Sequence, residues 1–380
     1  MSENNMNDKI VAVRLSKVRL PLKFAVSDAK VFTGRQKPVG DVAVLVAEID
    51  ADSGYSGMGF SYALRYGGEA QYAHAVELSP LLIGEDPNDI GKIWEKLIWA
   101  GASVGHSGIA VQAIAAFDTA LWDLKAKRAH LPLAKFIGSY RDSVAVYNTS
   151  GGYLQAPIAE VVEKAKGSLA KGICGIKMKV GQPDTAEDLR RVETLRKELG
   201  DSVPIMIDAN QQWDYPTALW FGRRVEDFDL TWIEEPLSAY DSLGHAALAA
   251  ALDTPVASGE MLSSIFEQTH LINHQAVDIL QPDAPRLGGI TPFLKLAEMA
   301  DAAGLGLAPH FVMEIHIHLA ACYPQEPWIE HFEWLEPLFN ERLKIADGRM
   351  YLPAGHGLGF TLSDEMRDLT VDAVLCNTPD

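Results

Sequence analysis

The chain has 380 residues, 48% of them hydrophobic, and a formal net charge of -18. This length suggests two domains, and the apolar share is sufficient for full cores. The acidic balance argues against nucleic acid or an anionic membrane as a partner, because either would need a basic surface. An anionic substrate would have to be held by local cations.

The cysteines and the N-terminal residues indicate in which cellular compartment the protein is expected. Cys174, Cys322 and Cys376 are widely spaced and form no CxxC pair, which favours free thiols in a reducing cytosol. The N-terminus is polar, and no segment approaches the roughly 20 apolar residues of a membrane helix. We therefore expect a soluble, cytoplasmic protein.

Residues 10–62 are predicted to form antiparallel strands. IVAVRLSKVRL alternates apolar and polar side chains, and VAVLVAEI is separated from YSGMGFSY by the turn DADSG, as in a hairpin. The polar connection of residues 23–38 is expected to be a long functional loop. From about Gly68 the spacing becomes helical. Residues 1–140 thus predict an α+β domain, completed by a C-terminal segment of about 335–380 whose last fifteen or so residues resemble a tail.

Residues 141–334 contain eight short strand-like runs. Three of them, VPIMIDAN, LTWIEEP and TPVASGE, end in Asp208, Glu234 and Glu260, which follow one another at intervals of 26 residues. This spacing fits a strand, a loop, a helix and a return loop. Eight such units predict an α/β fold with a closed TIM-like barrel, in which functional side chains gather at the carboxyl ends of the strands.

Three carboxylates at neighbouring strand ends would repel one another unless they surround a cation. Oxygen ligands without Cys or His select a hard ion such as Mg²⁺. A single acid at a strand end could merely cap a helix or pair with a surface lysine. Asp208, Glu234 and Glu260 in register favour a metal site.

Other strand-like runs of this region also contain or end in ionisable residues. Lys177 and Lys179 lie two apart on one strand, so both are expected to face the barrel interior and to lower each other's pKa, as suits a general base. They could equally neutralise carboxylates. Across the barrel, Asp283 would orient His310 as a second acid–base group. Glu330 ends the last run.

Two histidines do not fit this series. His316 and His318 form an HxH on an expected helix or loop, and we interpret them as structural. A zinc barrel hydrolase would carry its HxH on the first strand, but the run VAVYNTS contains no histidine. A scaffold that had lost activity would lack one of the two bases, and both are present.

The combination of IKMKVG, IDAN, WIEEP, SGE, QPDAPRLGG, the His after LAP and the Glu of PWIE resembles the mandelate racemase subgroup of the enolase superfamily, over nearly the whole chain. The resemblance implies a (β/α)7β barrel with an N-terminal capping domain. Within the subgroup, SDAKVFTGRQKP, YNTSGGYL and WIEHFEWLEPLFNER are most similar to L-talarate/galactarate dehydratases, which act on six-carbon diacids. The implied activity is that of a hydro-lyase.

The resemblance also implies a mechanism. The substrate carboxylate would chelate Mg²⁺, and removal of the α-proton would give an enediolate whose charge lies on the metal. Lys179 would be the base on one face. His310, supported by Asp283, would be the base on the other face and the acid that helps the β-hydroxide to leave. Bases on both faces would also allow some epimerisation.

Other residues are expected around the substrate. Lys177 and Glu330 would flank its carboxylate, with Glu330 protonated and donating a hydrogen bond, and Asn210 would contact the α-hydroxyl. A diacid needs a second clamp away from the metal, and the N-terminal loops are its expected source. The candidates there are Asp28, Lys30 and Arg65.

Some alternatives remain open. The sequence carries Leu64 where the resemblance implies a lysine, which leaves the precise acid sugar undecided. A racemase or epimerase of a 2-hydroxy acid would use the same site residues. A cycloisomerase would be expected to carry lysine in place of Asp283. The resemblance further implies a homo-oligomer.

Overall fold

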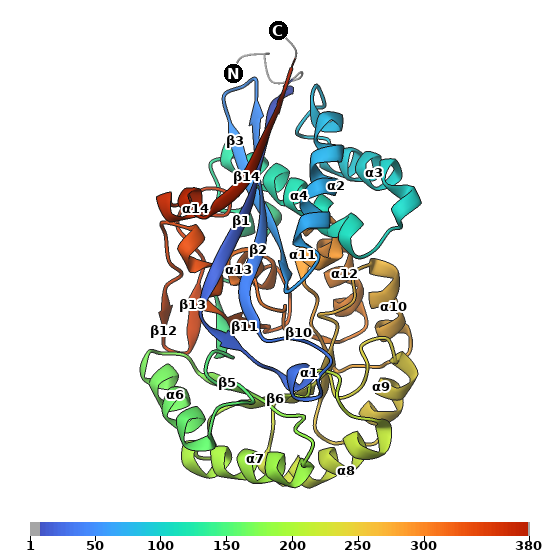
Figure 1. The fold of residues 1–380 in the computed structure, drawn as a ribbon, viewed down its shortest axis with the longest axis vertical. Coiled ribbons are helices and arrows are strands. Elements are labelled where there is room, and N and C mark those ends of the chain that lie inside the picture. Colours follow the sequence, from blue (N-terminus) through green and yellow to red (C-terminus); the bar gives the residue numbers. More distant parts are fainter. Residues whose placement is uncertain (1–7, 379–380) are drawn as a thin grey trace.

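The computed structural model describes residues 8–378, which form a capping region packed on a barrel (Figure 1). The capping sheet is antiparallel, in the order β14-β1-β2-β3. Its β2–β3 hairpin confirms the predicted one. The strands are β1 (Ile10–Val26), β2 (Val39–Ala51), β3 (Ser56–Leu64) and β14 (Thr370–Asn377).

The polar connection after β1 is shorter than predicted, because β1 continues to Val26. The connection contains a one-turn helix, α1 (Ala29–Phe32). Asp28 begins this helix by accepting hydrogen bonds from the backbone N–H groups of Lys30 and Val31. The connection thus has a defined conformation, and Figure 1 shows it reaching over the barrel.

The C-terminal segment divides between the two parts of the molecule. The interpretation of the last residues as a tail is wrong, because β14 pairs with β1 from Ala12↔Asn377 to Val18↔Thr370. Its run TVDAVLCN is rich in apolar residues, but the strand lies at the edge of the sheet and its side chains are largely exposed. The preceding hairpin of β12 (Ile345–Ala346) and β13 (Arg349–Tyr351) joins the barrel sheet instead.

The two faces of the capping sheet pack on different partners. One face contributes Leu45 and Ile49 to a core shared with three helices. Gly59 lies against these helices so closely that a Cβ would come within 2.3 Å of a backbone oxygen. The opposite face contributes Phe60 and Tyr62 to the core shared with the barrel. The three helices are α2 (Gly68–Leu78), α3 (Ile90–Ala100) and α4 (Ile109–Arg128).

The barrel contains the eight predicted parallel strands. Their order is β10-β9-β8-β7-β6-β5-β4, with β11 beside β4. The strands are β4 (Ser143–Asn148), β5 (Gly175–Lys179), β6 (Ile205–Asp208), β7 (Trp232–Glu234), β8 (Val256–Ser258), β9 (Ile279–Leu280), β10 (Gly306–Leu307) and β11 (Trp328–His331).

Helices follow most of these strands and cover the outside of the barrel (Figure 1). The interior is filled by side chains that include Tyr147 and Trp232, whose ring centroids lie 5.2 Å apart. The strand ends therefore open above a packed core. The remaining helices are α5 (Leu133–Ile137), α6 (Ile158–Ala170), α7 (Thr185–Leu199), α8 (Tyr215–Val225), α9 (Ser242–Ala249), α10 (Ile265–Asn273), α11 (Ala284–Leu287), α12 (Ile290–Ala302), α13 (Met313–Ala321) and α14 (Asp364–Asp368). Within residues 8–378, no helix is long and apolar enough to cross a membrane.

Candidate active site

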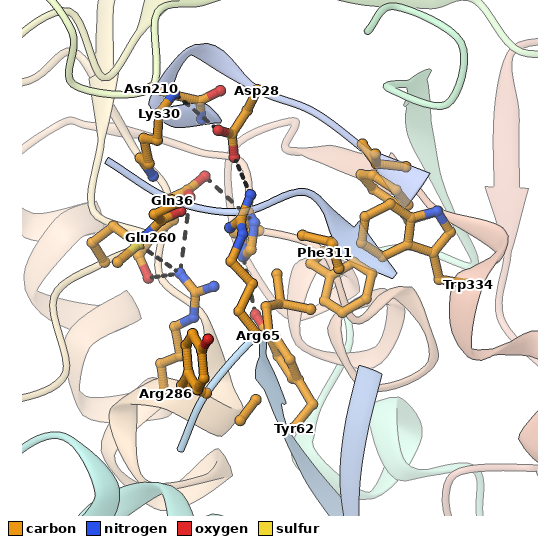
Figure 2. Close-up of a pocket in the computed structure, with 18 of the residues that line it drawn as sticks. Asp28, Lys30, Gln36, Tyr62, Arg65, Asn210, Glu260, Arg286, Phe311 and Trp334 are labelled. Carbon is orange, nitrogen blue, oxygen red and sulfur yellow. Dashed lines mark hydrogen bonds and ion pairs between the residues drawn. The ribbon is translucent and has the colours of Figure 1, made fainter. Parts of the chain in front are cut away.

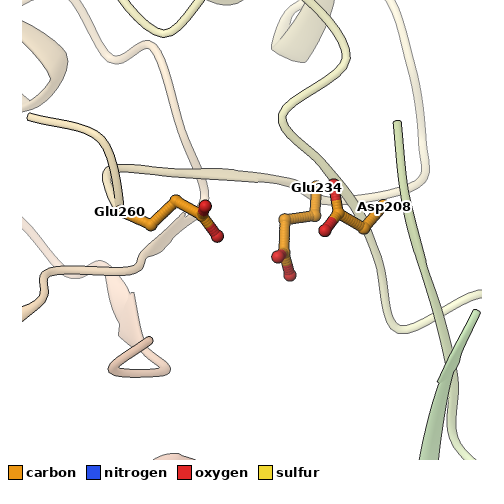
Figure 3. Close-up of side chains that lie close together, drawn as sticks. All are labelled: Asp208, Glu234 and Glu260. Atoms are coloured by element: carbon orange, nitrogen blue, oxygen red, sulfur yellow. The ribbon is translucent and has the colours of Figure 1, made fainter. Parts of the chain in front are cut away.

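The structure brings Asp208, Glu234 and Glu260 together at the mouth of the barrel (Figure 3). Asp208 ends β6, Glu234 ends β7 and Glu260 follows β8, so adjacent strands present all three. One carboxylate oxygen of each lies within 4.8 Å of the others, and all three side chains are buried. This arrangement could hold one hard cation.

The electrostatics of this acidic cluster fit a cation. Burial raises the pKa of Glu234 to about 7, and the nearby Asp208 and Glu260 act in the same direction, although Lys177 lowers it. The protein's own cations thus do not fully offset the charge of Glu234, whereas Lys179 and Lys177 hold the pKa of Asp208 low despite its burial. Asn210 donates to Asp208 at 3.1 Å, while its buried Oδ1 has no hydrogen-bond partner among residues 8–378.

Glu234 is held by three donors. The indole N–H of Trp232 donates to its Oε2 at 3.0 Å, and the Gln281 amide donates to the same oxygen at 2.7 Å. Its Oε1 accepts from Lys177 at 2.5 Å. These partners fix the orientation of the carboxylate, which is the usual role of groups behind a metal ligand.

Lys177 does lower the pKa of Lys179, as predicted, but the net shift of both lysines is upward, contrary to the expectation for a general base. Burial alone would lower the pKa of Lys177. The negative charges of Glu234 and Glu330 act in the opposite direction, and the net result is a pKa well above the usual value. Burial likewise lowers the pKa of Lys179, but Asp208, together with Glu260 and Glu234, raises it by more, so the net shift is upward. The alternative that the lysines neutralise carboxylates fits this result, because the carboxylates around them dominate the local field. A cation bound by the acids would compete with the lysines for these carboxylates.

Glu330 is ionised, contrary to prediction. Burial alone would raise its pKa, but Lys177 at 3.0 Å and the positive charge of His310 lower it to about 2. Its Oε1 accepts from Thr149 Oγ1 at 2.5 Å, and its Oε2 accepts from the Phe311 N–H at 2.7 Å. Neither Glu330 nor Lys177 is among the residues that line the cavity of the described structure.

Asp283 and His310 form a dyad. The Nδ1 of His310 lies 2.9 Å from Asp283 Oδ2, and its Nε2 lies 3.4 Å from Glu260 Oε2. The backbone N–H of Arg286 donates to Asp283 Oδ1 at 2.9 Å. Although burial would raise the pKa of Asp283, the hydrogen bond from His310 and the charge of Arg286 lower it to about 2. An ionised Asp283 fixes the proton on Nδ1 and leaves Nε2 facing the acidic cluster.

His316 and His318 have structural roles, as expected. Both are buried in α13. The Nε2 of His316 accepts from the Ala284 N–H at 3.0 Å. The Nδ1 of His318 accepts from the Ala134 N–H, and its Nε2 lies 3.0 Å from the Leu358 carbonyl oxygen. Burial lowers the pKa of each to about 4, so both rings are neutral near pH 7.

A cavity of about 360 Å³ lies between the capping region and the barrel (Figure 2). Lys179 and His310 both line it, together with Asn210 and Glu260. The capping region contributes the three predicted loop residues. They are Asp28, Lys30 and Arg65.

The loop residues differ in how they are held. Arg65 donates to Asp28 at 3.0 Å and to the Lys37 carbonyl oxygen at 2.5 Å, with a positive φ of 66°. Lys30 forms no ion pair with any described residue within 4.0 Å. Leu64 also lines the cavity. Lys30 is thus free of ion pairs with the described residues, whereas Arg65 is partly engaged within the loop.

Sequence reasoning missed several residues of this cavity. Tyr62 donates to Asp283 Oδ2 at 2.6 Å, and the Arg286 guanidinium lies 5.5 Å from the centre of the Tyr62 ring. Arg286 belongs to the run QPDAPRLGG, but no role was assigned to it. The alternation of Phe60, Tyr62 and Leu64 in β3 could have indicated a shared face, but not its partner. Further lining residues are Gln36, Tyr153 and Trp334.

Comparisons with known proteins cover both parts of the chain. Residues 12–138 match the family model described as mandelate racemase / muconate lactonizing enzyme, N-terminal domain. Residues 160–366 match the model described as enolase C-terminal domain-like. L-Talarate/galactarate dehydratase from Salmonella typhimurium is 60% identical over 363 residues, which are 96% of this chain and 91% of that protein. 3,6-Anhydro-alpha-L-galactonate cycloisomerase from Streptomyces coelicolor is 35% identical over 94% of this chain and 98% of its own.

Solved structures agree with these matches. The crystal structure of the Salmonella typhimurium L-talarate/galactarate dehydratase with Mg and L-lyxarohydroxamate has a TM-score of 0.98 and 57% identity, and the match covers 100% of this chain and 97% of that one. L-Talarate dehydratase from Polaromonas, complexed with Mg and L-glucarate, has a TM-score of 0.96 and 61% identity over 98% of this chain and 100% of that one.

Proposed function

The chain belongs to the mandelate racemase / muconate lactonizing enzyme family of the enolase superfamily, and we propose that it is a Mg²⁺-dependent dehydratase of hexarates such as L-talarate and galactarate. The reaction would remove the proton α to a carboxylate and eliminate the β-hydroxyl as water. The product would be a keto-deoxy diacid. The proposal is supported by relatives of 57% to 61% identity with these names and with Mg in their structures.

The metal ion would be held by Asp208, Glu234 and Glu260. When bound, Mg²⁺ supplies a Lewis acid for the negative charge that develops on the substrate carboxylate. Lys177 would keep Glu234 ionised and in place from below, and Glu330 would in turn hold Lys177. In this proposal Lys177 and Glu330 position the site, and neither donates a proton to the substrate.

Lys179 and His310 would carry the protons. Each lines the cavity, so a substrate seated at the acids can present one face of its α-carbon to Lys179 and the other to His310. His310 would act as a base through Nε2, because Asp283 holds the proton on Nδ1. On accepting a proton, the same nitrogen can return it to the departing β-hydroxyl. Asn210, which also lines the cavity, would contact the α-hydroxyl.

One observation carries this proposal: Lys179 and His310, the latter paired with Asp283, line the same cavity as Glu260 of the acidic cluster. Lys30 would bind the distal carboxylate, with Arg65 and Asp28 shaping the loop around it.

Two bases that line one cavity would also permit epimerisation of the substrate in addition to dehydration. A racemase would need the bases alone, whereas the cationic capping loop favours a diacid.

The decisive experiment is incubation of the protein with Mg²⁺ and a library of mono- and diacid sugars, with keto-acid formation as the readout. We expect L-talarate and galactarate to give product, and the reaction to stop when Mg²⁺ is chelated. The proposal fails if no six-carbon diacid gives product or exchanges its α-proton in D₂O, or if monoacids react preferentially.

Two further points belong to the proposal. We infer a cytoplasmic location, which Cys174, Cys322 and Cys376 fit as free thiols. We also infer a homo-oligomer, which light scattering of the purified protein would test by its mass relative to the 41.5 kDa chain.

A further inference from the structure

A buried tyrosine of the capping region reaches the catalytic dyad of the barrel. Tyr62 lies near the end of β3 and is 2% exposed. Its hydroxyl lies 2.6 Å from Asp283 Oδ2, the same oxygen that accepts from His310 Nδ1 at 2.9 Å. The Tyr62 oxygen is itself 3.5 Å from that nitrogen. A hydroxyl from one part of the molecule thus completes a hydrogen-bond network in the other.

The direction of these hydrogen bonds follows from the groups present. Burial raises the pKa of Tyr62 well above its usual value, so the phenol keeps its proton and donates it. Asp283 then accepts from Tyr62 and His310 through Oδ2, and from the Arg286 N–H through Oδ1. A carboxylate with both oxygens engaged by fixed donors cannot rotate freely. His310 is oriented by the carboxylate that Tyr62 helps to fix.

The ring of Tyr62 is itself held in place. It meets the Phe311 ring edge-on at 4.8 Å between centroids, and the Arg286 guanidinium lies over it at 5.5 Å. Leu64 and Arg65 follow Tyr62 in the chain and line the same cavity. The end of β3 thus both contacts the Asp283–His310 dyad and lines the cavity proposed to bind substrate.

We propose that Tyr62 is a positioning residue that holds Asp283, and through it the tautomer and orientation of His310, so that the capping region completes the acid–base apparatus on one face of the cavity. Lys179, which pairs with Asp208 on the other side, does not contact this network. Loss of the Tyr62 hydroxyl should therefore weaken only chemistry that depends on His310. The positioning role of Tyr62 does not depend on the proposed function. Only the expected effect on catalysis rests on it.

The test compares Tyr62→Phe with Tyr72→Phe. Phenylalanine keeps the ring contacts of Tyr62 and removes only the donor. Tyr72 is also a buried tyrosine of the capping region, but its hydroxyl has no hydrogen-bond partner among the described residues, so its loss is a matched control. Both variants should unfold at nearly the wild-type temperature.

The first readout is independent of substrate. Histidine-selective isotope labelling would follow the Nδ1–H proton of His310, assigned by its loss in His310→Asn. We expect Tyr62→Phe to accelerate solvent exchange of this proton by roughly tenfold, as the loss of one hydrogen bond from the network implies, and Tyr72→Phe to leave it unchanged. An unchanged exchange rate in Tyr62→Phe overturns the proposal, whatever the enzyme's substrate.

The second readout is α-proton exchange in D₂O with Mg²⁺ and the two hexarate epimers. In Tyr62→Phe we expect at least a roughly tenfold loss for the epimer that also fails in His310→Asn, and less than about a twofold change for the epimer that needs Lys179. Equal losses for both epimers would indicate a merely structural role and overturn the proposal. Absence of exchange in the wild-type protein would refute the proposed function, and the Nδ1–H signal would still decide the role of Tyr62.

Discussion

The ammonium nitrogen of Lys177 lies 2.5 Å from Oε1 of Glu234, and neither side chain is more than 1% exposed. Glu330 lies on the other side of the same nitrogen at 3.0 Å. One buried cation is thus shared between a member of the acidic cluster and a carboxylate beneath it. The stability and the chemistry of the site both depend on this buried charge balance, since removing one partner leaves an uncompensated charge away from water.

We expect Lys177→Met to destabilise the metal-free protein by about 3 kcal/mol or more, because Glu234 and Glu330 would lose their counter-charge. Urea unfolding in the presence of a chelator measures the change. Lys166→Met is the control, since its 2.8 Å pair with Glu198 is almost half exposed on both sides. Its loss should leave the free energy of unfolding close to that of wild type, because solvent screens an exposed ion pair. Similar losses in both variants would contradict this account of the buried pair.

Mg²⁺ should raise the unfolding temperature of the wild-type protein, because the acidic cluster exists only in the folded chain. At a free concentration of about 100 times the Kd, the gain should be about 2.7 kcal/mol. Glu260→Gln should abolish most of this gain and weaken binding in calorimetry. Glu163→Gln, an exposed acid on α6, is the control and should behave as wild type. A full metal response in Glu260→Gln would exclude this residue as a ligand.

Lys179→Ala and His310→Asn should each abolish dehydration of at least one hexarate epimer, with a loss of about 10²-fold or more. Each variant should retain α-proton exchange with the epimer whose proton faces the remaining base. Isotope exchange in D₂O, followed by NMR, separates the two activities. Full activity of both variants toward every substrate would refute the assignment of two bases.

Lys30→Met should raise KM for six-carbon diacids by about tenfold, since one charge-assisted hydrogen bond is worth about 1.5 kcal/mol. The KM for a monoacid of the same length should change little, because it has no distal carboxylate. Lys37→Met removes an exposed lysine of the same connection whose side chain does not line the cavity, and it serves as the control. An equal rise for mono- and diacids would place the distal carboxylate elsewhere.

Glu314 should make folding stability depend on pH. Its side chain is buried, its two carboxyl oxygens have no hydrogen-bond partner among the described residues, and burial raises its pKa from 4.5 to about 8. Between these values the folded state holds a proton that the unfolded state releases. The contribution of Glu314 to stability is therefore full below about pH 4.5 and declines as the pH rises toward 8.

Glu314→Gln should remove this decline, so the variant should gain stability relative to wild type by about 1 kcal/mol for each pH unit within the window. Urea unfolding at pH 6 and pH 9 measures the difference. Glu298→Gln, an exposed acid on α12, is the control and should show no such trend. A constant difference between Glu314→Gln and wild type at both pH values would show that Glu314 does not titrate in this range.

Much of the fold was predictable from local patterns. A buried parallel strand is a short apolar run, and its last residue marks the mouth of the barrel, so the ends at Asp208, Glu234 and Glu260 could be located without coordinates. The run TVDAVLCN of edge strand β14 is compatible with a strand, but its pairing with β1 is a long-range backbone contact that local patterns do not reveal.

The sequence by itself determined which residues stand at the strand ends, because strand length and side-chain alternation are local properties. Tertiary structure alone decided their charge states and partners. Lys177 is a strong cation and Glu330 an anion because each is buried beside the other, and Tyr62 meets Asp283 from 221 residues away. Electrostatic and hydrogen-bond energies depend on distance in space and on exclusion of water, and neither quantity is encoded by spacing along the chain.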